Sequence, residues 1–106
     1  MNKKILIIED DADLRLGYNV LLRASHYDTF FAADAMCAII EARKCMPDVI
    51  VLDLGLPGGD GFVVLGRLRS NLQLSMIPVI VVSGRDLPGN RERAHFAVAP
   101  PGARWF

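Results

Sequence analysis

Three short apolar runs in this sequence each end in a polar residue, and these polar residues could together bind a metal ion and a phosphate. The acid pair Glu9 and Asp10 follows the first run, Asp53 follows the second, and Ser83 follows the third. Carboxylate oxygens are hard ligands that suit Mg²⁺, which keeps several waters and also binds phosphate oxygens. A serine hydroxyl can donate a hydrogen bond to the same phosphate. The pattern predicts a magnesium-dependent phosphate site, provided that the fold brings these residues together.

Each of these positions also has an ordinary structural explanation. An acidic run such as that from Glu9 to Asp13 is often a solvated helix start, Asp53 could cap a loop, and Ser83 could form a turn. The glycine-rich segment 55–61 reads as a turn before a capped helix, and it lacks the spacing of a phosphate-binding glycine loop. The repeated order of apolar run followed by polar residue favours a shared site over coincidence.

The apolar runs predict strands of a parallel sheet. Residues 5–8, 49–52 and 79–82 are rich in β-branched side chains and show no polar alternation, which is typical of strands covered on both faces. A weaker run over 27–33 predicts a further strand near an edge. Ligands of open α/β sheets bind beyond the carboxyl ends of the strands, where the polar residues lie.

Apolar residues at helical spacing occupy the intervals between these runs, over residues 14–22, 35–40, 62–72 and 90–98. Asp60 can cap the third helix, and Pro100 ends the fourth. The start of a last strand is expected at 103–106. Strict alternation of strand and helix predicts a doubly wound α/β sheet with right-handed crossovers, formed by one domain over residues 1–106.

Composition narrows the choice of partner and compartment. The 106 residues are 52% apolar, and twelve basic side chains balance twelve acidic ones, so the net charge favours neither nucleic acid nor a membrane as partner. No apolar run approaches the length of a membrane span. Cys37 and Cys45 have neither metal-ligand spacing nor the density of a disulfide framework. We therefore expect a cytoplasmic protein.

The motifs in combination resemble the receiver domains of two-component response regulators, the CheY-like family. The matching segments are Ile-Leu-Ile-Ile-Glu-Asp-Asp at 5–11, Asp-Val-Ile-Val-Leu-Asp-Leu-Gly-Leu-Pro-Gly-Gly-Asp-Gly at 48–61, Pro-Val-Ile-Val-Val-Ser-Gly at 78–84, and Gly102-Ala103 before an aromatic residue. The likeness runs the length of the chain. It implies a flavodoxin-like sheet with strand order 2-1-3-4-5.

The resemblance implies a phosphoacceptor signalling domain of a two-component system rather than an independent enzyme. Asp53 would receive a phosphoryl group from a sensor histidine kinase or a phosphotransfer protein, with Mg²⁺ as cofactor, and the change would alter partner binding. The metal would be held by Glu9, Asp10, Asp53 and the backbone carbonyl of Gly55. The switch residues would be the hydroxyl of Ser83 and the aromatic side chain of Phe106.

The carboxyl end departs from the family pattern. The family carries a lysine shortly after the aromatic residue of the last strand, whereas this sequence stops at Phe106. We therefore expect a receiver domain that is incomplete at this end, with the fifth strand cut short and the fifth helix absent. The alternative is a self-contained short receiver that closes its core through a partner chain. The sheet face beside the first helix would then be an apolar patch, which favours self-association.

Two other functions stay open on the sequence alone. A pseudo-receiver would keep the fold as an interaction module without being phosphorylated, and the missing lysine favours it. A magnesium-dependent phosphatase with an aspartate nucleophile commonly has a second acid two residues after that nucleophile, where this chain has Gly55. The cognate kinase and the output are not specified by any segment.

Overall fold

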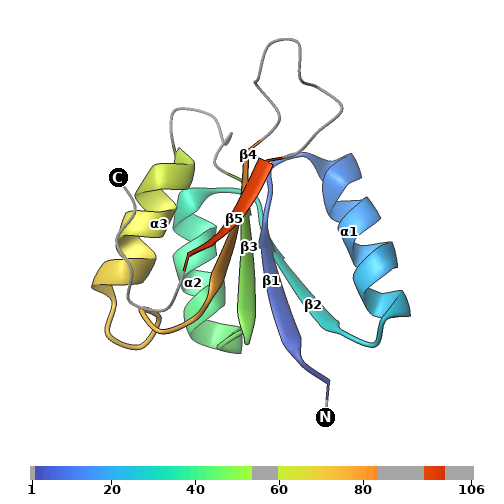
Figure 1. Ribbon diagram of the computed structural model, residues 1–106, viewed down its shortest axis with the longest axis horizontal. Helices are drawn as coiled ribbons and strands as arrows, with labels where there is room; N and C mark the ends of the chain where they lie inside the picture. The colour runs from blue at the N-terminus through green and yellow to red at the C-terminus, as the bar shows by residue number, and fades with distance from the viewer. Residues whose placement is uncertain (1, 54–59, 84–94, 100–106) are drawn as a thin grey trace.

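The computed structural model describes residues 2–53, 60–83 and 95–99, which form a five-stranded sheet with helices on both faces. Figure 1 shows α1 on one face and α2 with α3 on the other. The strands are β1 (Lys4–Ile8), β2 (Asp28–Ala32), β3 (Val49–Asp53), β4 (Val79–Ser83) and β5 (His95–Ala99). The helices are α1 (Ala12–Ala24), α2 (Ala35–Cys45) and α3 (Asp60–Ser70).

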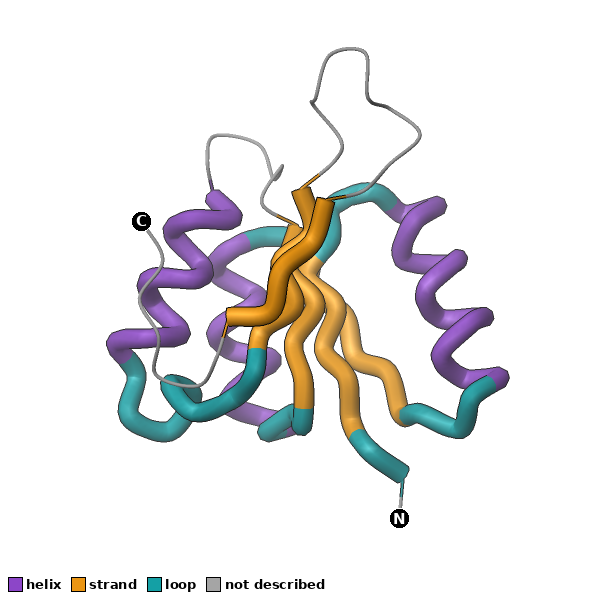
Figure 2. The backbone as a smooth tube through the Cα atoms, viewed as in Figure 1, coloured by secondary structure: helices purple, strands orange, loops and turns teal. Residues whose placement is uncertain are grey.

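The sheet has the order β2-β1-β3-β4-β5, and its first four strands are parallel. The predicted α/β fold and strand order are confirmed for these strands. The register pairs Ile8 with Leu52 and Asp53 with Val82. Because parallel strands end at the same edge, the last residues of β3 and β4 lie at the edge where β1 leads into its acidic residues. Figure 2 shows the short loop from β1 to α1 leaving the sheet at this edge.

The carboxyl-terminal prediction was wrong over residues 95–98, which were expected to be helical. They belong to β5, which runs antiparallel to β4 with Val82 opposite Phe96 and Ile80 opposite Val98. Phe96 and Val98 lie two residues apart, a strand period, and the outer edge of β4 offers backbone groups that need hydrogen bonds. The strand expected at 103–106 and the place of a fifth helix lie outside the described residues.

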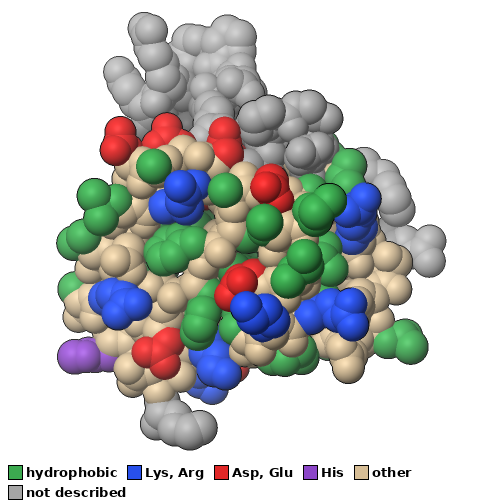
Figure 3. Space-filling model, turned by 180° about the vertical axis from the view of Figure 1, so that it is seen from behind, with side chains coloured by type: hydrophobic (Ala, Val, Ile, Leu, Met, Phe, Trp, Pro, Cys, Tyr) green, Lys and Arg blue, Asp and Glu red, His purple; other side chains and the backbone are tan. Residues whose placement is uncertain are grey.

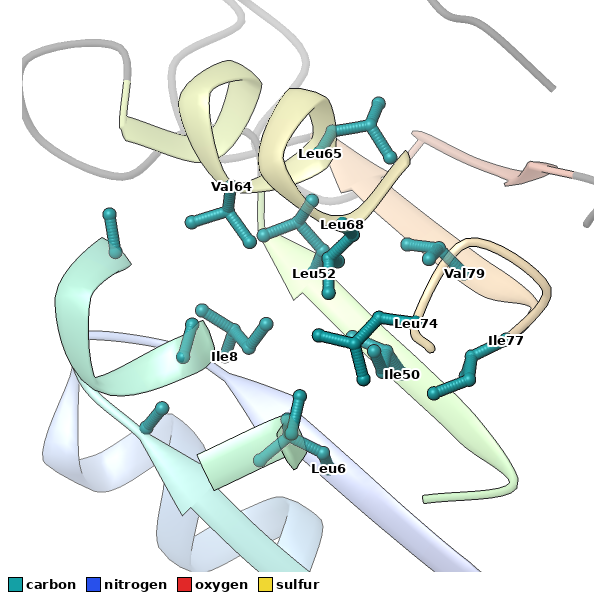
Figure 4. Close-up of a cluster of buried hydrophobic side chains, with 14 of the residues drawn as sticks. Leu6, Ile8, Ile50, Leu52, Val64, Leu65, Leu68, Leu74, Ile77 and Val79 are labelled. Carbon is teal, nitrogen blue, oxygen red and sulfur yellow. The ribbon is translucent and has the colours of Figure 1, made fainter. Parts of the chain in front are cut away.

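The main core lies between the sheet and the two helices α2 and α3. Alternate strand residues point toward it, and α2 contributes small side chains that let the helix approach the sheet closely. Figure 4 shows the larger side chains converging on this core, among them Leu6, Ile8, Ile50, Leu52, Val64, Leu65, Leu68, Leu74, Ile77 and Val79. The core therefore fixes β1 and β3, the strands that precede the acidic residues.

The other face is covered more thinly by α1, none of whose residues is buried. The apolar stripe predicted there is largely exposed, since Leu14 and Leu21 keep 47% and 70% of their surface accessible. A polar link joins the helix to β2: Arg23 Nε donates to Asn19 Oδ1 at 2.7 Å, and the hydroxyl of Thr29 donates to the same oxygen at 2.8 Å. Self-association through this face stays a prediction.

The first turn of α2 is capped by Asp34, whose side chain accepts a hydrogen bond from the Cys37 backbone N–H at 2.8 Å. This backbone hydrogen bond lowers the pKa of Asp34, and a hydrogen bond from the Cys37 side chain lowers it further by a smaller amount. The lowered pKa means that the carboxylate stabilises the fold above its ordinary pKa and that this contribution is lost as the pH falls through the folded value.

We expect Asp34→Ala to lower the urea midpoint at neutral pH, because α2 loses its cap. Asp34→Asn should keep most of the midpoint, since asparagine also caps helices, and should lose the acid-dependent part. Far-UV circular dichroism during urea titration at neutral and at acid pH measures both effects. Equal midpoints for the alanine variant and the wild type would contradict the assignment.

Candidate metal centre

Three carboxylates meet where β1 and β3 end. One side-chain oxygen from each of Glu9, Asp10 and Asp53 lies within 4.8 Å of the others. Glu9 is 4% exposed and Asp53 6% exposed, whereas Asp10 is half-buried. Aspartate and glutamate side chains are mostly exposed in proteins, so the burial of Glu9 and Asp53 distinguishes this cluster from an ordinary solvated acidic run.

The turn between β1 and α1 is held by the acidic residues themselves. The Glu9 N–H donates to the Ala32 carbonyl at 3.0 Å, which extends the pairing of β1 with β2 by one residue. The Glu9 carboxylate accepts the Asp11 N–H at 3.1 Å. Asp11 in turn caps α1 by accepting the N–H groups of Asp13 and Leu14. The acidic run therefore serves as a helix start and also orients Glu9.

Arg15 is a residue near the site that sequence reasoning missed. Its guanidinium donates to the Glu9 carbonyl oxygen at 2.7 Å, so it ties the first turn of α1 to the end of β1. Only its position, one helical turn after the capping residue Asp11, could have indicated the role.

Tyr18 is a second such residue. It falls within the apolar helical spacing expected over residues 14–22, and in the structure it is half-buried. Burial raises the pKa of its phenol, and the negative charges of Glu9 and Asp53 raise it further. Tyr18 therefore lies close enough to both acids for their charges to affect its phenol.

The donor set fits a hard divalent cation. It offers only carboxylate oxygens, with three like charges whose repulsion a cation would relieve. So few protein ligands leave room for water and a phosphate oxygen, which is the coordination habit of Mg²⁺. Glu9, Asp10 and Asp53 are thus the described residues able to hold the ion.

The other predicted site residues are placed only in part. Ser83 is the last residue of β4, one position after Val82, the partner of Asp53 in the β3–β4 register. This backbone position puts Ser83 at the same sheet edge as the acids. Gly55 and Phe106 lie outside the described residues.

The fold and the acid cluster define a CheY-like α/β domain with a candidate cation site. The chemotaxis protein CheY4 of Vibrio cholerae superposes with a TM-score of 0.74 at 25% identity, over 87% of this chain and 77% of that one. The receiver domain of sensor histidine kinase PA1611 from Pseudomonas aeruginosa PAO1, whose structure has magnesium coordinated in the active site cleft, gives 0.75 at 27% identity over 88% and 76%.

The chain belongs to the response regulator receiver family, because the family model for the response regulator receiver domain matches residues 5–99. The response regulator PleD of Caulobacter vibrioides is 35% identical over 92 residues, which are 86% of this chain and 20% of PleD. The chain thus spans about a fifth of this relative. The family is in general one of signalling rather than catalysis, and its members interact with histidine kinases or phosphotransfer proteins. Among the described residues, no helix is both long and apolar enough to cross a membrane.

Proposed function

We propose that this chain is a phosphoacceptor domain that receives a phosphoryl group on Asp53 from a histidine kinase or phosphotransfer protein. The observation that carries the proposal is the buried cluster of Glu9, Asp10 and Asp53 at the ends of two parallel strands. These carboxylates and the Gly55 carbonyl would hold Mg²⁺. The magnesium-bound receiver domain of PA1611 supports the choice of ion.

In the proposed transfer, a carboxylate oxygen of Asp53 attacks phosphorus, and the bond between phosphorus and the donor histidine nitrogen breaks. The product is an acyl phosphate on Asp53 and a histidine that retains the electron pair of the broken bond. Bound Mg²⁺ would supply positive charge against the phosphoryl oxygens. The protein holds the reacting groups in place. Asp53 is the last residue of β3 and follows the fully buried Leu52, and the Glu9 carboxylate accepts a hydrogen bond from the Asp11 N–H.

The proposed readout of phosphorylation uses Ser83 and Phe106. An acyl phosphate adds charge and three acceptor oxygens at the end of β3. Ser83, at the same edge, would donate its hydroxyl to one of these oxygens. Movement of Phe106 as the aromatic switch rests on the family resemblance. Together these changes would alter which partner the domain binds.

A pseudo-receiver without phosphorylation is the second candidate, because none of the lysines among the described residues lies at the sheet edge that carries Asp53. The three lysines of the chain are Lys3, Lys4 and Lys44. The Lys4 ammonium group donates a hydrogen bond to the Cys45 carbonyl at 3.2 Å, at the sheet edge opposite Asp53. An aspartate-nucleophile phosphatase is less favoured, because Gly55 stands where its second acid is expected.

Incubation with acetyl phosphate separates these functions. A phosphoacceptor gains the mass of one phosphoryl group in the presence of Mg²⁺ and not in the presence of EDTA, as measured by intact-mass spectrometry. Beryllofluoride provides an independent adduct at the same aspartate. The pseudo-receiver would be favoured if the mass of a phosphoryl group were gained equally with and without Mg²⁺. It would also be favoured if neither reagent gave an adduct.

We expect Asp10→Asn to weaken Mg²⁺ binding by at least about tenfold, because it removes one of three clustered charges without changing side-chain size. Isothermal titration calorimetry with MgCl₂ measures the affinity. The matched control is Asp13→Asn, which makes the same charge change in the exposed first turn of α1, outside the cluster. An equal loss in both variants would show that general acidity, and not the cluster, binds the ion.

A further inference from the structure

A groove separate from the acid cluster lies beside the C-terminal half of α2. It has a volume of about 370 Å³ and is lined by Ile40, Arg43 and Lys44 of α2 and by Gln73 of the turn that follows α3. Figure 3 views the molecule from the side on which α2 lies, where hydrophobic, basic and acidic side chains are mixed. None of the lining residues belongs to the acid cluster.

Large apolar side chains are exposed on both elements that border the groove. On α2, Met36 and Ile40 lie one helical turn apart and are 71% and 54% exposed. On the turn after α3, Leu72 is 94% exposed and Met76 64%. Ile40 lines the groove and Leu72 directly precedes the lining residue Gln73, so exposed apolar surface is present on both elements beside it.

The turn that forms one wall of the groove is fixed from within. Arg69 Nη1 donates to the Ser75 carbonyl at 3.0 Å and to the Ile77 carbonyl at 3.1 Å. The Asn71 side chain accepts the Gln73 N–H at 2.9 Å, and Leu74 is fully buried in the core. A wall formed in advance lowers the entropy cost of binding a partner.

Arg43 and Lys44 give the groove positive charge beyond that which stabilises the C-terminal carbonyl groups of α2. Cations near a helix C-terminus commonly stabilise its carbonyl groups. Here the Lys4 ammonium already binds the Cys45 carbonyl, and the Met46 N–H caps the Ala42 carbonyl at 2.9 Å. Arg43 and Lys44 therefore remain available to an outside carboxylate, and the groove has no acid among its described lining residues.

We propose that this groove binds an acidic amphipathic helix of a partner protein. Its apolar side chains would contact Ile40 and Leu72, and its carboxylates would pair with Arg43 and Lys44. A concave site with two cations suits a peptide better than a lipid surface, which is typically bound by four to eight clustered basic residues. The surface is separate from Asp53, so the proposal does not rest on phosphorylation.

The test uses a fluorescein-labelled synthetic helix with leucines on one face and glutamates on the other, and a matched peptide with lysines in place of the glutamates. Anisotropy gives the affinity, and ¹H–¹⁵N correlation spectra give the site. We expect only the glutamate peptide to bind, with shifts over residues 36–44 and 71–77. The double variant Arg43→Glu, Lys44→Glu should bind at least about tenfold more weakly.

Arg67→Glu is the control, since this exposed arginine of α3 is not among the lining residues of the groove. Leu72→Ala tests the apolar contact with little risk to the fold, and we expect it also to weaken binding. The proposal is overturned by absence of peptide binding, by shifts confined to other surfaces, or by equal weakening from Arg67→Glu. It is also overturned if phosphatidylserine vesicles bind through Arg43 and Lys44 and the peptide does not.

Discussion

Replacement of Asp53 by asparagine is expected to abolish phosphorylation of the chain by acetyl phosphate while leaving the fold intact. The amide has nearly the size of the carboxylate but lacks the anionic oxygen that attacks phosphorus. The variant also removes one of three like charges that lie within 4.8 Å. Its free energy of unfolding in the absence of metal should therefore equal or exceed that of the wild type. Intact-mass spectrometry measures the adduct, and urea titration measures the stability.

The matched control is Asp48→Asn, the same substitution next to the opposite end of β3. Asp48 is exposed, and its carboxylate accepts the Lys4 N–H at 2.8 Å. We expect this variant to gain a phosphoryl group as the wild type does. A phosphoryl adduct on Asp53→Asn would place the acceptor elsewhere and remove the main basis of the proposed function.

Leu52→Ala is expected to cost about 2–5 kcal/mol of the free energy of unfolding, the range for truncating a buried leucine. Leu52 is fully buried against α3 and immediately precedes Asp53. Small domains are stable by about 5–15 kcal/mol, so this loss would be a large part of the total. Because Leu52 directly precedes Asp53 in β3, loss of its packing should also weaken Mg²⁺ binding. Urea titration with and without MgCl₂ measures both effects.

Leu72→Ala makes the same change at a side chain that is 94% exposed. We expect its free energy of unfolding to lie within about 0.5 kcal/mol of the wild type. If both leucine variants lose similar stability, the core as described does not hold β3 in place.

The part of the fold that could be predicted from the sequence is the part in which pattern and burial agree. The run 5–8 is buried on both faces in β1, whereas in β3 and β4 alternate residues are buried and those between them are half-buried. Continuous apolar residues nevertheless indicated all three strands correctly. The clustering of Glu9 with Asp53 then followed from parallel pairing alone. The roles of these residues in metal binding and phosphate transfer stay predictions.

The features that could not be predicted depend on how elements pack against one another. The contact of Arg15 with the Glu9 carbonyl depends on the path from β1 into α1, and the electrostatic environment of Tyr18 depends on the rotation of α1 over the sheet. The strand at His95–Ala99 depends on a partner edge formed by β4. Local sequence there offered both a helical and a strand period, and only the distant edge decided between them.

The strand order also has a consequence for how the chain folds as it is synthesised. β1 is made first and pairs with both β2 and β3, and each later strand adds at the outer edge of the one before it. The growing chain can therefore assemble its sheet outward from the amino-terminal strand, without waiting for the carboxyl end to provide a central strand. Each parallel pairing still requires a helix to form between its strands, so every added strand closes a long loop and folding is slowed at these steps.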